Sequence, residues 1–268
     1  MTTNERDYVL GTHDEELTRL GIQHRVWRSR ALEAWREAGF TFGQTLVDVG
    51  SGPGHALLDL AELVGAEGKV IAIDRSRRFL DALNARGRSN VETFEADLDV
   101  DALPDVEADG AWVRWVFAFV TRPQDLLRRI HERLKPGANL VIHEYFDYRT
   151  WRFSPRSPIF EEFVSTVMES WRASGGEPDV GLDLPRWLEE TGFTIKRLRP
   201  HVDVVKPESD IWQWPKTFIA SGVERLVELG RMTPQRGADV RAEFARYEEL
   251  PHARLVTPAV LEIIATRV

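Results

Sequence analysis

The sequence predicts an α/β protein with a Rossmann-like, doubly wound, mostly parallel seven-stranded sheet. Short apolar runs of strand length alternate with amphipathic helical stretches over residues 45–145, the pattern of a parallel sheet with helical connections. The first apolar run passes directly into three glycines at alternate positions, Gly50, Gly52 and Gly54, before a helical stretch begins. The apolar content of 43% over 268 residues is ample for a core of this kind.

An N-terminal helical extension precedes the sheet. Over residues 13–38 apolar side chains recur at helical spacing, and acidic residues occupy the first turn, where they suit the helix dipole. We therefore expect three regions, which are a helical cap over residues 1–40, a ligand-binding core over 41–147, and the remaining core strands with helical lid insertions over 148–268.

The elements of the core follow in order from the same pattern. Strands are expected at residues 45–49, 69–74, 91–96, 110–117 and 139–145. Helices are expected between them at residues 54–64, 76–86 and 123–134, the last beginning at a proline.

The pattern loosens after residue 146. A structured loop is expected at 149–158, and a strand at 192–205 with an interruption near Pro200. Residues 255–268 are rich in β-branched side chains and could return to the sheet. Helices are expected at 158–174, at 184–191 and, broken near Gly230 and Pro234, over 211–247.

The glycine turn points to a nucleotide-like ligand. Glycine permits a left-handed backbone and lets a ligand approach the main chain closely. The strand at residues 69–74 ends at Asp74, and a carboxylate at that place can accept both hydroxyls of a ribose. A dinucleotide fingerprint requires GxGxxG, but His55 stands where its third glycine belongs.

Five features follow one another over residues 45–145: Val47-Asp48-Val49 with the glycine turn, Asp74, Asp97-Leu98, Asp109 to Trp115, and Leu134-Lys135-Pro136-Gly137-Ala138. In this order they resemble the class I S-adenosylmethionine (SAM) methyltransferases. The last motif usually ends in a second glycine, so Ala138 is a mild departure at a turn. The leader, from Tyr8 to Gly11 and from Glu16 to Gln23, resembles the N-terminal extension of bacterial small-molecule methyltransferases near the quinone-biosynthesis group.

The resemblance implies SAM as the cofactor, S-adenosylhomocysteine as the product, and a set of contacts along the ligand. The implied contacts are Gly50, Ser51 and Gly52 at the methionine end, Asp74 and Arg75 at the ribose, Asp97, Leu98 and Phe79 at adenine, Arg114 at the SAM carboxylate or the substrate, Trp115 in the pocket wall, and Tyr8 and Gln23 from the N-terminal extension.

The implied reaction is transfer of the methyl group to a small-molecule acceptor, with aromatic or apolar compounds as candidates and O-, N- or C-methylation left open. Aromatic side chains are plentiful after residue 145 and suggest a lid over a flat substrate. A general base is required only when the acceptor holds its proton tightly. The candidates are His143, Glu144 and His201.

Two alternatives stay open at this point. The glycine turn could belong to an NAD(P)-dependent oxidoreductase, although His55 weakens this interpretation. The protein could also be a non-catalytic SAM-binding subunit, because methyl transfer needs no single indispensable side chain.

Composition limits partners and location. The formal net charge of −8 disfavours nucleic acid, which needs a basic face. Without cysteine there can be no disulfide or thiolate metal site, and the seven histidines show no paired spacing, so no metal is expected. No apolar run could span a bilayer and no signal peptide begins the chain, so we expect a cytoplasmic monomer or homodimer.

Overall fold

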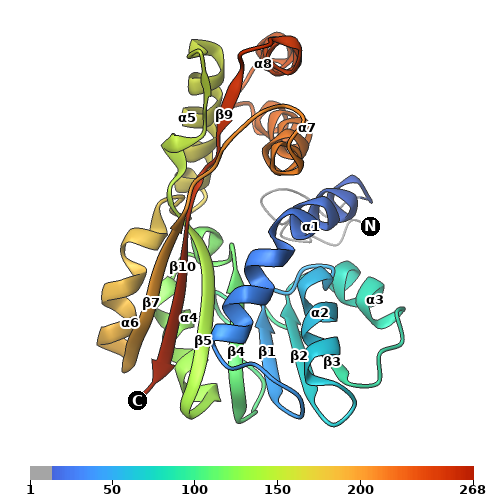
Figure 1. Ribbon diagram of the computed structural model, residues 1–268, viewed down its shortest axis with the longest axis vertical. Coiled ribbons are helices and arrows are strands. Elements are labelled where there is room, and N and C mark those ends of the chain that lie inside the picture. Colours follow the sequence, from blue (N-terminus) through green and yellow to red (C-terminus); the bar gives the residue numbers. More distant parts are fainter. Residues whose placement is uncertain (1–13) are drawn as a thin grey trace.

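The computed structural model describes residues 14–268 and contains a central sheet that runs the length of its lower half (Figure 1). The strands of this sheet are β1 (Thr45–Val49), β2 (Lys69–Asp74), β3 (Val91–Glu95), β4 (Ala108–Arg114), β5 (Leu134–Asp147), β7 (Phe193–His201) and β10 (Ala259–Arg267). Within the described residues the sheet has seven strands in the order β3-β2-β1-β4-β5-β10-β7. The pairs among β1 to β5 are parallel, and β10 is antiparallel to both of its neighbours.

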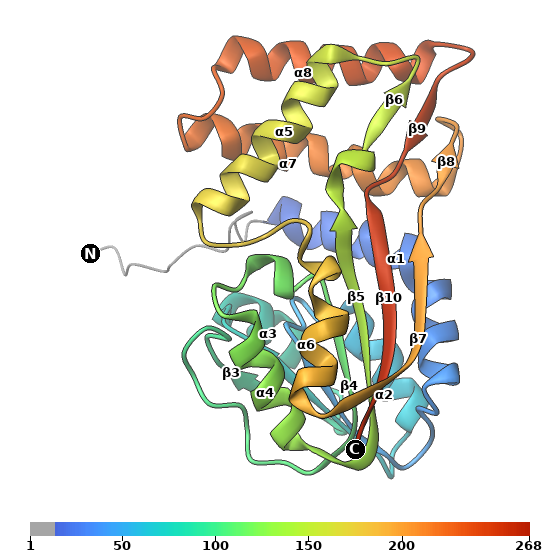
Figure 2. The same ribbon diagram turned by 90° about the vertical axis from the view of Figure 1, so that its left-hand side faces the viewer.

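Helices cover both faces of the sheet, as a doubly wound fold requires (Figures 1 and 2). One face carries α1 (Asp14–Glu37), α2 (His55–Val64) and α3 (Arg77–Asn84), and the other carries α4 (Pro123–Arg133) and α6 (Leu184–Thr191). Each layer of helices encloses its own apolar core against the sheet. Four 3₁₀ turns complete the described chain: η1 (Phe117–Phe119), η2 (Tyr148–Thr150), η3 (Val180–Leu182) and η4 (Asp210–Trp212).

Above the carboxyl end of the sheet stands a second group of elements, which we call the upper subdomain. It consists of the strands β6 (Arg152–Ser154), β8 (Val204–Val205) and β9 (Arg254–Val256) with the helices α5 (Pro158–Ala173), α7 (Gln213–Glu228) and α8 (Pro234–Glu249). Its strands form a small sheet in the order β6-β9-β8. Three strands of the central sheet lead directly into it, because β5 precedes β6, β7 precedes β8, and β9 precedes β10 (Figure 2).

Several strand boundaries differ from the sequence-based expectation. β4 and β5 begin earlier than expected, at Ala108 and Leu134, and β5 ends later, at Asp147. The strand expected at 110–117 ends at Arg114, because Trp115 adopts a positive φ of 52° that turns the chain into η1. The interruption expected near Pro200 falls after His201 instead. Pro200 lies within β7, which is an edge strand and so tolerates a residue without an N–H group.

The upper subdomain contains a strand that was not anticipated from the sequence. The segment 149–158, expected as a loop, includes β6, and a three-residue strand is too short to show a period in sequence. The expected return of the segment 255–268 to the central sheet is confirmed for β10, which is inserted between β5 and β7, whereas residues 255 and 256 belong to β9 of the small sheet. No helix among residues 14–268 is long and apolar enough to cross a membrane.

Candidate functional site

A cavity lies at the carboxyl ends of β1, β2 and β4, under the upper subdomain. Its space amounts to about 1200 Å³ when the part open to solvent is counted, which suits a ligand of cofactor size. Its walls come from α1, from the glycine turn and from the ends of the strands, and Trp171 of α5 and Phe218 of α7 close it from above. This is the crevice at which doubly wound sheets bind their ligands.

The glycine turn forms the floor of the cavity. Gly50 has a φ of +71°, and a Cβ there would stand 2.4 Å from Cγ2 of Val116. Gly52 has a φ of +55°, and its N–H donates to Oδ2 of Asp74 over 2.8 Å. The turn therefore presents bare backbone to the cavity, as a glycine-rich ligand site requires.

Asp74 connects the turn to the end of β2. Its Oδ1 accepts from the N–H of Ser76 over 2.8 Å, so both carboxylate oxygens hold backbone donors. Burial raises the pKa of Asp74, while the backbone hydrogen bonds from Ser76, Gly52 and Arg75 oppose the rise. Because a carboxylate has about four lone-pair sites, Asp74 keeps acceptor capacity for a ligand hydroxyl.

Arg114, at the end of β4, is a half-buried cation beside the cavity. Its Nη2 donates to Nδ1 of His24 over 3.2 Å, and its guanidinium carbon lies 5.6 Å and 5.1 Å from the ring centres of Trp112 and Trp115. Burial lowers the pKa of Arg114 to about 10, and the charge of Asp48 opposes the shift. Its Nη1 is buried without a hydrogen-bond partner among the described residues.

Asp48, inside β1, lines the same end of the cavity. Burial raises its pKa to about 7, although the charge of Arg114 acts against the rise. Its Oδ2 is buried and has no hydrogen-bond partner in the described part of the chain. Asp48 belongs to the Val47-Asp48-Val49 motif but was not among the ligand contacts expected from the sequence. The available signal was a carboxylate at the centre of an otherwise apolar strand.

The residues expected at the adenine end gather at the same cavity. Phe79, Asp97 and Leu98 all line it, together with Arg75. Oδ1 of Asp97 accepts from the N–H of Asp99 over 3.0 Å, which fixes this carboxylate in a local turn. The carboxylate still has acceptor capacity for a ligand N–H group.

Aromatic rings form the wall opposite the glycine turn. Trp115 stacks on Tyr145 with 5.6 Å between ring centres and 18° between planes. Phe119 packs on Trp171 with 4.6 Å between ring centres. These four side chains and Phe218 line the cavity, so its upper part is flat-walled and apolar.

The N-terminal helix reaches the cavity through Gln23. Its Oε1 accepts from Nη1 of Arg19 over 2.8 Å, and Arg19 also holds both carboxylate oxygens of Glu16 over 2.6 Å. Gln23 and Arg19 both line the cavity. Tyr8, the other contact expected from this extension, lies outside the described residues.

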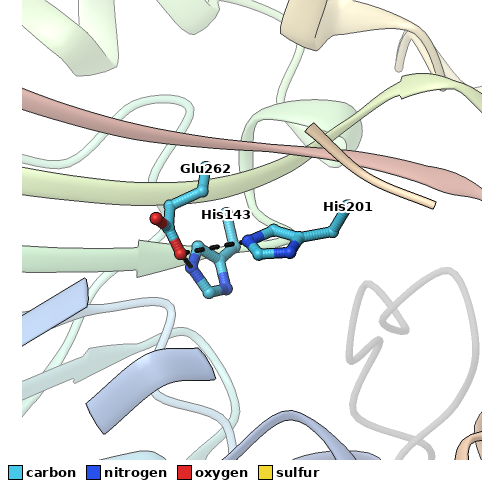
Figure 3. A group of neighbouring side chains, drawn as sticks. All are labelled: His143, His201 and Glu262. Atoms are coloured by element: carbon cyan, nitrogen blue, oxygen red, sulfur yellow. Dashed lines mark hydrogen bonds and ion pairs between the residues drawn. The ribbon is translucent and has the colours of Figure 1, made fainter. Parts of the chain in front are cut away.

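None of the three candidates for a general base lines the cavity. Glu144 accepts from the N–H groups of Ala118 and Tyr145 over 3.3 Å and 3.0 Å, and burial raises its pKa to about 7. His143 and His201 both turn their Nε2 atoms to Glu262 (Figure 3). The alternation of β5 thus directs His143 and Glu144 to opposite faces of the sheet, and neither side chain reaches the cavity.

Comparison with known proteins shows that the chain is similar to methyltransferases. Residues 47–142 match the family model described as a methyltransferase domain. The ubiquinone/menaquinone biosynthesis C-methyltransferase of Azotobacter vinelandii is 32% identical over 130 residues, which cover 47% of this chain and 50% of that protein. The chain spans between 50% and 63% of the length of the curated relatives of this kind.

Solved structures show the same fold. A methyltransferase structure from Bacillus halodurans superposes with a TM-score of 0.59 at 16% identity, covering 89% of this chain and 99% of that one. A geranyl diphosphate methyltransferase solved in complex with SAM gives a TM-score of 0.56 at 16% identity, covering 91% and 87%. The expected resemblance to methyltransferases and the expected fold class are confirmed, and neither alternative function is favoured.

Proposed function

We propose that this protein, whose residues 47–142 form a class I SAM-dependent methyltransferase domain, transfers a methyl group from SAM to a small-molecule acceptor. When bound, SAM supplies a methyl group made electrophilic by the positive charge on sulfur. The side chains of the cavity then have to align the two reactants and exclude water.

The observation that carries the proposal is a pair of opposite charges with unused hydrogen-bonding capacity. Oδ2 of Asp48 and Nη1 of Arg114 are both buried at the cavity and have no hydrogen-bond partner among the described residues. Leaving such groups unpaired is costly, so a ligand that satisfies both would bind there. The amino-acid end of SAM offers an ammonium group for Asp48 and a carboxylate for Arg114, whereas a nicotinamide dinucleotide offers neither.

The remainder of the cofactor would lie along the predicted contacts. Asp74 would accept hydrogen bonds from the ribose hydroxyls with the lone pairs that its backbone donors leave free. Asp97 would accept from the adenine amino group, and Phe79 would pack against the ring. Asp48, Asp74, Asp97 and Phe79 all line one cavity, which supports a single extended ligand.

For the acceptor we propose a planar, largely apolar molecule. Trp115, Tyr145, Phe119, Trp171 and Phe218 line the part of the cavity above the glycine turn. Since two of these rings come from α5 and α7, we propose that the upper subdomain is a lid over the acceptor. The relative from Azotobacter vinelandii, named as a C-methyltransferase of quinone biosynthesis, is consistent with such an acceptor.

We propose that the protein catalyses methyl transfer chiefly by aligning SAM and the acceptor. His143, Glu144 and His201 stand outside the cavity, so none of them is offered as the base that activates the acceptor. An acceptor whose nucleophile needs no strong base fits this arrangement.

We also propose a cytoplasmic protein that acts on a small molecule as a monomer or homodimer, without nucleic acid. The net charge of −8 supports the absence of a nucleic-acid partner, because phosphate backbones attract basic surfaces.

Calorimetric titration with S-adenosylhomocysteine, with NAD in parallel, tests the cofactor. We expect saturable binding of S-adenosylhomocysteine, and none of NAD. Asp74→Ala should weaken the binding of S-adenosylhomocysteine about tenfold or more, since a hydrogen bond to a charged group contributes about 1.5–3 kcal/mol. Glu95→Gln is the matched control, because Glu95 ends the neighbouring β3 in register with Asp74 but pairs with Arg77 outside the cavity.

Binding of NAD in preference, or equal affinity in wild type and Asp74→Ala, would contradict the assignment of the cavity. Turnover is a separate readout. Formation of S-adenosylhomocysteine from SAM in the presence of planar phenolic or quinol acceptors would exclude a non-catalytic subunit.

A further inference from the structure

Three side chains distant in sequence meet outside the cofactor cavity. His143 comes from β5, His201 from the end of β7 and Glu262 from β10, and their polar atoms point toward one another (Figure 3). Nε2 of His143 and Nε2 of His201 lie 3.0 Å and 3.1 Å from Oε2 of Glu262. Each residue offers one ligand atom, and these atoms all lie within 4.8 Å of one another.

The second carboxylate oxygen of Glu262 has no hydrogen-bond partner among the described residues. This atom, Oε1, lies 3.5 Å from Nη2 of Arg197 and 3.9 Å from Nη1 of Arg199. Both arginines also form ion pairs with carboxylates of α1, Arg197 with Glu37 and Arg199 with Glu33. The fully buried Glu262 therefore shares its two guanidinium neighbours with other carboxylates.

We propose that His143, His201 and Glu262 bind a divalent transition-metal ion of the zinc class. Two imidazole nitrogens and one carboxylate oxygen are ligands that Zn²⁺ prefers. Tetrahedral zinc with bonds of about 2.0–2.2 Å holds its ligand atoms about 3.3 Å apart. Small side-chain rotations would bring the three ligand atoms of the cluster, which lie within 4.8 Å of one another, to this separation. His143 and Glu262 are fully buried, whereas the His201 side chain is 11% exposed and gives the ion a path from solvent.

The position of the cluster assigns the ion a structural role. β5, β7 and β10 are the three strands that continue into the upper subdomain (Figures 1 and 2). The cluster joins them near that junction, because His201 ends β7 and His143 of β5 lies opposite Glu262 of β10. Trp27 of α1 packs edge-on against His143 and His201, with ring centres 5.6 Å and 5.7 Å apart, and against Trp115 at 5.3 Å. Bound metal would thus fix the strands that carry the upper subdomain and the helix that reaches the cavity.

The test uses the full chain without an affinity tag, stripped with EDTA and titrated with ZnCl₂, with MgCl₂ in parallel. We expect one Zn²⁺ per chain, a rise in melting temperature with Zn²⁺ and none with Mg²⁺. His201→Ala and Glu262→Gln should each weaken Zn²⁺ binding about tenfold or more, because even loss of an outer-shell partner costs 10–100-fold. His252→Ala is the control, since His252 is exposed, lies in the turn between α8 and β9, and does not belong to the cluster.

Absence of saturable Zn²⁺ binding, or equal binding in wild type and His201→Ala, would overturn the proposal and leave a hydrogen-bonded structural cluster. Circular dichroism first establishes that each variant folds. If the variants do not fold, nuclear magnetic resonance of histidine-labelled wild type tests Zn²⁺ binding at this cluster. The ring signals of His143 and His201 must then shift on Zn²⁺ addition while that of His252 stays, and unchanged signals would refute the site.

Discussion

The pH dependence of cofactor binding follows from the buried carboxyl group in β1. Burial raises the pKa of Asp48 to about 7, the charge of Arg114 acts against the rise, and the charge of Asp74 adds to it. Only the ionised form of Asp48 would hold the ammonium group of S-adenosylhomocysteine. The affinity for this ligand should therefore rise as the pH rises through about 7.

The magnitude follows from the fraction of protein that is ready to bind. A carboxyl group with a pKa of about 7 is ionised in about one tenth of molecules at pH 6 and in about nine tenths at pH 8. Because apparent affinity scales with the competent fraction, binding should be about tenfold tighter at pH 8, or about 1.4 kcal/mol. Burial lowers the pKa of His24 to about 4, so this imidazole stays neutral over this range, and burial also lowers the pKa of His55.

The assay is calorimetric titration with S-adenosylhomocysteine at pH 6, 7 and 8, on wild type and on Asp48→Asn. The variant keeps the size of the side chain but cannot ionise, so it should bind more weakly at pH 8 and lose the dependence due to this group. Glu95→Gln should retain the wild-type profile, since that side chain does not line the cavity. The same pH dependence in wild type and Asp48→Asn would refute the reasoning, as would affinity that falls with pH.

Three further predictions concern stability and the acceptor. Folding raises the pKa of the Asp48 carboxyl group, so the free energy of unfolding of the ligand-free protein should fall as pH rises between about 4 and 7. At pH 8, ligand-free Asp48→Asn should therefore be more stable than wild type by about 1 kcal/mol or more and should have the higher melting temperature. Thermal melts at pH 4 and pH 8 check this, and a gap that does not widen with pH would count against it. Gly50→Ala should destabilise the fold by about 2 kcal/mol or more in urea titrations, because its Cβ would stand 2.4 Å from Val116. Gly87→Ala, at a φ of +63° with nothing within 4 Å, should cost less, and equal losses would show that the contact is irrelevant. Trp171→Ala should raise the KM of the acceptor about tenfold while the affinity for S-adenosylhomocysteine stays within about twofold, and a parallel loss of both would contradict an acceptor-side role.

Much of the fold could be predicted because its signals are local. Apolar runs that alternate with 3.6-residue periods specify a doubly wound sheet, and the glycines after β1 mark its ligand end. The same local motifs singled out Asp74, Asp97 and Arg114, and all three line one cavity. Each of them ends or follows a parallel strand, and the carboxyl ends of such strands meet at one edge.

Other features depend on contacts between distant segments, which leave no period in the sequence. Glu262 lies 119 residues from His143 and 61 from His201, so only the antiparallel insertion of β10 between β5 and β7 brings them together. The small sheet of the upper subdomain likewise forms only when β6 and β8 meet β9.

Neighbouring residues carry the signals for the resemblance to methyltransferases, for the order of the core elements and for the side chains at the strand ends, so the sequence was sufficient to predict all three. The tertiary structure decided which polar atoms are left unpaired. Oδ2 of Asp48 and Nη1 of Arg114 lack hydrogen bonds because burial removes water and no described side chain replaces it. It also decided that His143 and Glu144 face away from the cavity, since the pleat of β5 and its neighbours fix where each side chain points.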